Sequence, residues 1–350
     1  MASKFNKGDV SEGILAAAIT ARFVSKTKSI TRNDVESIIK KLKPYTAGAK
    51  GTTSATEFAS ANLKKSVVDT VVCFVNLAEV NMKAFLAAGT YKDADVIKLV
   101  NASVVYANGP HVCAWANMMY ENNQKNKIEV RSEGLLDQSG TKVDLRVVID
   151  GKRTGVGISL KVGDVKQFGQ VGGASVETME EFFGSLGVKF DASFKTKFDK
   201  FVSEKKPVEA LTLAYTVAHT QLNKLQPKRL RSNLSAFMKF HATRNEENVI
   251  LLQLNKGQAT VYMFEALEEK LVGVPMLVEY KMATTQVIAG AKLPQLLIYG
   301  GDKIGPKNLI LQLRVKLEGN RVNSKGKTVG LTVRNYVEKG ALTTELIAGH

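Results

Sequence analysis

A hydrophobic segment, residues 141–170, constrains this chain more than any other stretch of the sequence. It reads TKVDLRVVIDGKRTGVGISLKVGDVKQFGQ. Two runs rich in β-branched residues, 143–149 and 156–162, flank the turn DGKRTG, and this pattern predicts two neighbouring strands. The first run contains Asp144, and the second contains Lys161. A carboxylate and an ammonium in an apolar hairpin are costly to bury unless they are paired or bind something, so we interpret them as members of a site.

The charge of the chain favours a polyanionic partner. Its 350 residues are 44% hydrophobic and 23% charged, which is typical of a globular protein and excludes a disordered one. The 49 Lys and Arg residues outnumber the 33 Asp and Glu residues, for a net charge of +16. A protein this basic usually binds nucleic acid, an anionic membrane surface or an acidic partner. We expect its partner to be DNA.

Several classes of protein are excluded by what the sequence lacks. The N-terminal stretch has no apolar signal core, and no run of 18 apolar residues occurs, so we expect a soluble cytoplasmic protein with no membrane partner. For a phage-encoded protein, the location would be the host cytoplasm or the virion. The four histidines and two cysteines show no metal-ligand spacing, so no zinc site is expected.

The hydrophobic periodicity predicts an α/β (α+β) chain that is helical first and β-rich last. Helices are expected at 8–23, 31–42, 62–89, 92–107, 110–124, 175–186, 191–203 and 207–242. Strands are expected at 127–133, 143–149, 156–162, 249–254, 259–264, 274–288, 295–300, 308–317 and 328–336. Residues 45–60 are expected to be a loop. No linker marks a domain boundary, and the expected regions are a mainly helical N-terminal part at 1–125, which contributes the first core helix, a core at 126–255 and a β-rich extension at 256–350.

An acid and a lysine on adjacent strands suit the hydrolysis of a phosphodiester. This reaction needs an attacking water, neutralisation of charge at phosphorus and a stabilised leaving oxygen. A Mg²⁺ ion held by carboxylates supplies most of this. A nearby lysine positions or deprotonates the water and stabilises negative charge. Asp144 and Lys161 are spaced to project from the same edge of a sheet.

The chain here resembles the PD-(D/E)XK nuclease superfamily, which includes restriction endonucleases and Holliday-junction resolvases. The matching residues are VD at Val143 and Asp144 and SLK at residues 159–161. Ser159 stands where the family has its second acid. The resemblance implies that the core at 126–255 is nuclease-like (restriction-endonuclease-like), with a central mixed sheet flanked by helices. It also implies Asp144 as a metal ligand, Lys161 as a catalytic residue, and Mg²⁺ as the cofactor with Mn²⁺ as its substitute.

Glu12 is the candidate for the missing acid, as both a catalytic residue and a metal ligand. The family often has a glutamate on its first helix in the phrase KG-x-x-x-E, and this chain reads KGDVSE there. A structural alternative is that Glu12 complements the helix dipole. Glu133 and Asp150 are less favoured alternatives. Some family members also carry a glutamine on a helix after the lysine, which makes Gln167 a fourth catalytic candidate.

Two further hypotheses stay open. The phrase VEYK places Glu279 and Lys281 as a second acid-x-lysine pair, with Glu265 upstream, although alternation along the strand more simply gives a polar outer face. DNA contacts are expected from basic side chains, which neutralise phosphates. The candidates are Lys166, Lys228, Arg229, Arg231 and Arg334.

The sequence therefore predicts a Mg²⁺-dependent DNA endonuclease, restriction-like or encoded by a phage or mobile element. The alternative is a catalytically inactive DNA-binding protein, or a virion or scaffold protein, that retains the fold. A homodimer is an open alternative by analogy alone.

Overall fold

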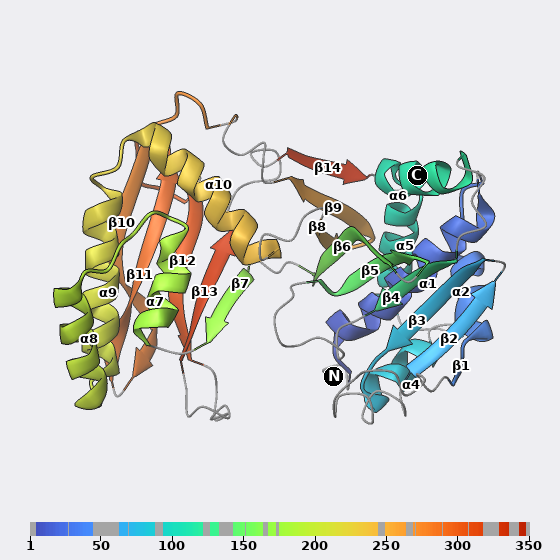
Figure 1. The fold of residues 1–350 in the computed structure, drawn as a ribbon, viewed down its shortest axis with the longest axis horizontal. Coiled ribbons are helices and arrows are strands. Elements are labelled where there is room, and N and C mark those ends of the chain that lie inside the picture. Colours follow the sequence, from blue (N-terminus) through green and yellow to red (C-terminus); the bar gives the residue numbers. More distant parts are fainter. Residues whose placement is uncertain are drawn as a thin grey trace. The chain divides into compact units, whose positions relative to one another are not determined.

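The computed structural model divides the chain into two compact units. Unit 1 comprises Met1–Asp164, Thr243–Tyr262 and Glu345–His350, and unit 2 comprises Val165–Ala242 and Met263–Thr344. The structure describes residues 5–26, 28–44, 63–68, 70–87, 94–121, 127–132, 143–150, 152–163, 167–172, 175–243, 249–263, 269, 271–288, 290–306, 308–317, 329–335 and 343–347. The two units together make a mixed α/β chain, as the sequence predicts (Figure 1).

Unit 1 is built on a nine-stranded mixed sheet of order β1-β2-β3-β4-β5-β6-β8-β9-β14. Its strands are β1 (Lys43–Pro44), β2 (Leu63–Val68), β3 (Val71–Asn76), β4 (Ile128–Ser132), β5 (Leu145–Ile149), β6 (Lys152–Val162), β8 (Val249–Asn255), β9 (Gln258–Met263) and β14 (Thr343–Ile347). The pairs β3–β4 and β6–β8 are parallel, whereas β4, β5 and β6 form an antiparallel run. Asp150, with φ +49, makes the tight turn between β5 and β6 that the DG dipeptide predicts.

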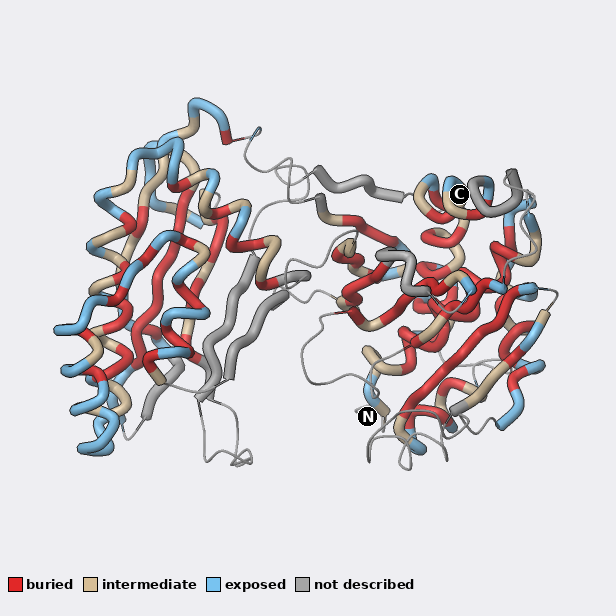
Figure 2. Tube along the Cα trace, in the orientation of Figure 1, coloured by how far each residue is buried: buried red, intermediate tan, exposed pale blue. Residues whose placement is uncertain are grey.

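Helix α1 (Lys7–Ser25) lies at the centre of unit 1 and is buried from Val10 to Phe23 (Figures 1 and 2). It packs against β3, β4 and β6 on one side and against the other helices on the other. Those helices are α2 (Arg32–Lys41), α4 (Glu79–Ala87), α5 (Ala94–Ala107) and α6 (Pro110–Glu121). The side chain of Asn6 caps the start of α1 by accepting a hydrogen bond from the Gly8 N–H at 2.9 Å. Small residues such as Gly13, Ala17 and Ala18 let α1 approach the sheet closely.

The two faces of the unit 1 sheet differ in what covers them. The alternate residues Val71, Cys73 and Val75 of β3 belong to the main core, together with side chains from all five described helices. Val72 and Phe74, which point the other way, form a separate small cluster. We call the helix-covered side the inner face and the opposite side the outer face.

Unit 2 is a five-stranded antiparallel sheet with helices. The strand order is β10-β11-β12-β13-β7. Its strands are β7 (Gln167–Gly172), β10 (Met276–Ile288), β11 (Ala291–Gly300), β12 (Leu309–Leu317) and β13 (Val329–Asn335), and its helices are α7 (Val176–Gly184), α8 (Ala192–Ser203), α9 (Pro207–Leu222) and α10 (Pro227–Thr243). Helix α9 packs on β10 and β11. Edge-to-face contacts among Phe182, Phe183 and Tyr215 fill the space between the helices.

Within the described residues of the chain, no helix combines the length and the apolar character needed to cross a bilayer.

Several sequence-based expectations need correction. The single helix expected at 62–89 is instead the hairpin β2–β3 followed by α4. Every residue of β3 is buried, so the run lacks the alternation that distinguishes a strand from a buried helix. Most described residues of region 1–125 are helical, but the region also contributes β1, β2 and β3 to the sheet. The two units do not follow the three expected ranges, because Val165–Ala242 of unit 2 lies between β6 and β8 and Met263–Thr344 follows β9. The loop expected at 45–60 lies outside the described residues.

Gly13 tests whether close packing of α1 on the sheet is needed. An added Cβ would lie 3.0 Å from Val75 Cγ1 and 3.0 Å from Phe85 Cδ2, and both side chains are fully buried. We predict that Gly13→Ala lowers the free energy of unfolding by about 1–2 kcal/mol, because overpacking outweighs the gain in helix propensity. Urea unfolding followed by the fluorescence of Trp115, the single tryptophan, measures this in unit 1.

The control for this substitution is Gly184→Ala, at the end of α7. No atom lies within 4 Å of the added Cβ, so stability should be unchanged or slightly higher by circular dichroism. Equal stability of the two variants would contradict the close-packing account.

Candidate active site

The candidate site lies where three strands of unit 1 end their shared ladder. The last partners are Ser132 with Leu145 and Leu145 with Ile158, so Asp144 and Ser159 come one residue further on. The Asp144 N–H donates to the Ile158 carbonyl at 2.9 Å. The Leu160 N–H donates to Asp144 Oδ2 at 2.5 Å. Backbone and side chain thus both fix Asp144 against β6.

Glu12 reaches this site from α1. Its side chain is buried, and Ser132 Oγ donates to Glu12 Oε2 at 3.4 Å. Burial raises the pKa of Glu12 well above its usual range, and the negative charges of Asp144 and then Asp9 raise it further. The Ser132 hydrogen bond and the positive charge of Lys161 act in the opposite direction. The pKa of Glu12 therefore responds to the charges of Asp144 and Lys161, so the three groups share one electrostatic environment.

Asp9 is a fourth charged residue near the site, and no sequence motif predicted it. Asn81 Nδ2 donates to Asp9 Oδ2 at 2.6 Å, and Asn6 Nδ2 donates to Oδ1 at 2.8 Å. Burial raises the pKa of Asp9, its own backbone N–H opposes this, and the charge of Asp144 raises it again. The spacing of three residues between Asp9 and Glu12, on one helix face, was the available signal. Asp9 also ties the start of α1 to α4 through Asn81.

Lys161 and Ser159 lie on β6 beside these acids. Lys161 Nζ donates to the Leu160 carbonyl at 3.1 Å. Ser159 stands at the position of the missing acid, and its Oγ is buried without a hydrogen-bond partner among the described residues. An orphaned buried hydroxyl costs free energy unless something else satisfies it, such as a water or a ligand atom.

Some predicted site residues lie elsewhere. Gln167 belongs to unit 2 and lies on a strand, β7, not on the expected helix, where its register partner is Arg334 of β13. Lys228 and Arg229 are exposed in the first turn of α10. Arg231 Nη1 donates to the Val274 carbonyl at 3.3 Å. These positions are in unit 2, whereas Asp144 is in unit 1.

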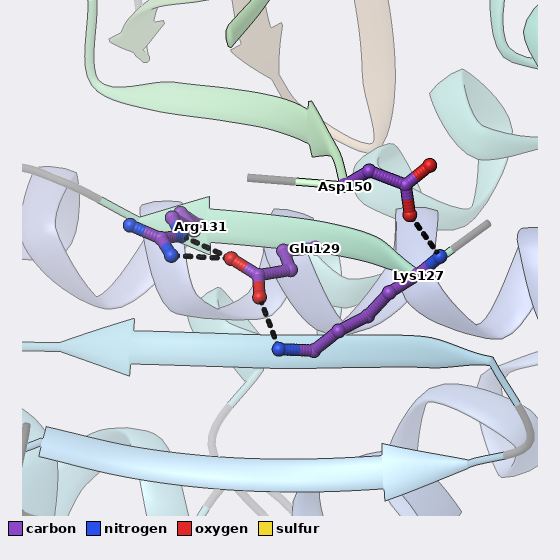
Figure 3. Close-up of polar contacts among 4 residues, drawn as sticks. All are labelled: Lys127, Glu129, Arg131 and Asp150. Carbon is purple, nitrogen blue, oxygen red and sulfur yellow. Dashed lines mark hydrogen bonds and ion pairs between the residues drawn. The ribbon is translucent and has the colours of Figure 1, made fainter. Parts of the chain in front are cut away.

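Other predicted residues fall outside the described ranges or away from Asp144. Lys166, Glu133 and Glu265 lie outside the described residues. Asp150 is at the opposite end of β5 from Asp144, where its carboxylate accepts a hydrogen bond from the Lys127 N–H at 2.8 Å (Figure 3).

The second acid-x-lysine pair lies on β10 of unit 2. Lys281 Nζ is 3.1 Å from Glu279 Oε2, and Tyr299 donates to the same oxygen at 2.7 Å. The two charges therefore satisfy each other on the strand.

Glu12 and Asp144 are carboxylates, the ligand type that hard divalent cations prefer. Among the described residues, no group of three or more His, Cys, Asp or Glu side chains could hold a metal ion. The pair Glu12 and Asp144 is nevertheless the set that Mg²⁺ commonly uses, since this ion keeps several waters and takes one or two carboxylates together with phosphate oxygens. A cation there would also relieve the repulsion that raises the pKa of Glu12.

Comparisons of the chain with protein-family models, with curated protein sequences and with solved structures found no match.

The raised pKa of Glu12 makes stability depend on pH. Above the pKa of an unfolded glutamate, the unfolded chain loses this proton more easily than the folded one, so stability falls as pH rises through the folded pKa. We predict that Glu12→Gln raises Tm by a few degrees near pH 8, and that the gain disappears near pH 4. Differential scanning calorimetry across this range measures it.

Glu79→Gln on α4 is the matched control, since Glu79 is exposed and its pKa is lowered by the hydrogen bond and the charge of Lys83. This variant should show no gain at high pH. A Tm for Glu12→Gln equal to or below that of the natural chain near pH 8 would contradict the burial of a repelled carboxylate.

Proposed function

We propose that this chain is a Mg²⁺-dependent DNA endonuclease that hydrolyses phosphodiester bonds. One observation carries the proposal. Glu12 of α1, Asp144 before β5 and Lys161 on β6 are far apart in sequence, yet they form one electrostatically coupled cluster where the sheet ladder ends. A buried acid with a strongly raised pKa beside other charged side chains is a candidate functional group.

The arrangement supports the resemblance to PD-(D/E)XK nucleases. The acid and the lysine come from antiparallel neighbours β5 and β6 of a mixed sheet, and the glutamate comes from the first helix, as the resemblance implies. Glu12 would serve as the second metal-binding acid, because Ser159 occupies the motif position where the family has that acid. The basic charge of the chain fits a nucleic-acid substrate.

Each residue has a distinct role in the proposed reaction. Glu12 and Asp144 would hold the metal ion, which supplies Lewis-acid activation and neutralises charge when bound. The Leu160 N–H fixes Asp144 in place. The Lys161 ammonium orients the attacking water and stabilises negative charge on the phosphate as one bridging P–O bond breaks and a new P–O bond to water forms. The Ser159 hydroxyl offers a hydrogen bond to water in the site.

Ser159 also favours a second candidate, a DNA-binding protein without catalysis. A hydroxyl in place of an acid leaves the site one charge short for tight metal binding. This candidate predicts DNA binding with no calorimetric signal on addition of Mn²⁺, and Asp144→Ala would change neither result.

A plasmid relaxation assay with Mg²⁺ tests the nuclease directly. We predict that the natural chain nicks or linearises the plasmid, and that Asp144→Asn and Lys161→Gln each lower the rate at least about 100-fold, because metal binding or charge stabilisation is lost. The controls Asp199→Asn and Lys197→Gln change exposed residues of α8 by the same chemistry and should keep the rate. An intact plasmid with both Mg²⁺ and Mn²⁺, or full activity in Asp144→Asn, would refute the proposal.

A further inference from the structure

The outer face of the unit 1 sheet carries a row of basic residues across neighbouring strands. The ladder pairs Lys43 with Lys65, Lys65 with Phe74, Phe74 with Arg131 and Arg131 with Arg146. Register partners project from the same face of a sheet, and Phe74 belongs to the outer face. The row therefore crosses β1 to β5 on the side away from the described helices. We call Lys43, Lys65 and Arg131, which are exposed or half-buried, the cation row; their neighbour Arg146 is buried, with 4% of its surface exposed.

One aromatic ring organises the middle of the cation row. Lys65 Nζ lies 5.5 Å from the centroid of the Phe74 ring, and Arg131 Cζ lies 5.0 Å from it. Each cation gains from the face of the ring, and the ring is itself covered, with 9% of its residue surface exposed. The two like charges near one ring repel each other.

A buried carboxylate anchors the row from the neighbouring position on β4. Glu129 accepts hydrogen bonds from Arg131 Nε, at 2.9 Å, and Nη2 (Figure 3). Its other oxygen lies 2.6 Å from Lys127 Nζ. The side chains of Lys127 and Arg131 keep 56% and 39% of their surface exposed, so both cations remain accessible. Lys43, Lys127 and Arg131 carry three positive charges against the one negative charge of Glu129, so this group of residues is net positive.

The cation row leads to the candidate active site. Arg146 is two residues after Asp144 on β5, and its register partner Gly157 is two residues before Ser159 on β6. Two residues along a strand cover about 7 Å. Arg146, the register partner of Arg131, therefore lies about 7 Å along the strands from the site.

We propose that the cation row docks the phosphodiester backbone of a nucleic acid and leads it across the sheet to Asp144 and Lys161. The proposal rests on the nuclease function for its purpose, and charge complementarity identifies the occupant. Phe74 is covered by its two cations, so it offers no ring for base stacking. Docking is thus independent of sequence and sensitive to salt.

Fluorescence anisotropy with a labelled DNA duplex of about 30 base pairs tests the docking, with EDTA present so that no cleavage occurs. We expect Lys65→Gln and Arg131→Gln each to weaken binding about 5- to 10-fold near 0.1 M salt and to reduce the slope of log Kd against log salt by about 1. The double variant should lose about 2 in slope. Lys83→Gln, an exposed lysine of α4 that pairs with Glu79, is the matched control and should bind as the natural chain does.

Two further variants separate docking from folding and from catalysis. Glu129→Gln combined with Arg131→Gln leaves no unpaired buried carboxylate, and it should show the same loss of affinity with a native melting curve. Asp144→Asn should bind DNA normally and fail to cut it. Unchanged affinity and slope in the Lys65 and Arg131 variants, or a preference for anionic lipid vesicles over DNA, would overturn the docking proposal. Normal cutting by Asp144→Asn would instead overturn the nuclease proposal and leave the docking result standing.

Discussion

The burial of the Glu12 carboxylate near the negative charge of the half-buried Asp144 is the constraint on which the rest of the proposed site depends. Like charges that are poorly solvated destabilise a folded protein, and here they raise the pKa of Glu12. Two apolar residues in place of Glu12 and Asp144 would avoid this destabilisation. Close packing of α1 on the sheet creates this repulsion, and Lys161 offsets it only incompletely. A bound cation would neutralise these charges, and the same arrangement would then be a binding site that no longer destabilises the fold.

The hydrogen-bond ladder of β4, β5 and β6 positions both the candidate site and the surface proposed to dock the nucleic-acid backbone. The antiparallel run β4, β5 and β6 ends beside Asp144, and the same register aligns Arg131 with Arg146. A shift of one residue along β5 would move Arg146 to the inner face and separate Asp144 from β6. The buried row Ser132, Leu145 and Ile158 fixes that register, because each residue fills the core from its own strand.

The sequence predicted much of this fold, and its failures have physical causes. The hairpin β5–β6, helix α1 and strands β8 to β13 were visible because each has a clear period or turn signal. Strand β3 was missed because it is buried on both faces, and β7 because glycines hide its pattern. Glu12, Asp144 and Lys161 were predicted as site residues from short motifs, and that role stays a prediction. Asp9 and the pairing of Arg131 with Arg146 were not, since they depend on tertiary packing and register that no local pattern encodes.

A carboxyl titration of Glu12 by carbon-13 NMR, with and without Mg²⁺, tests the central claim most directly. The signal is assigned by its loss in Glu12→Gln. We predict a midpoint well above the usual range for glutamate in the absence of the ion, and a large downward shift when Mg²⁺ is added, because the ion favours the ionised form. A midpoint near that of an exposed glutamate, or one that Mg²⁺ leaves unchanged, would contradict it.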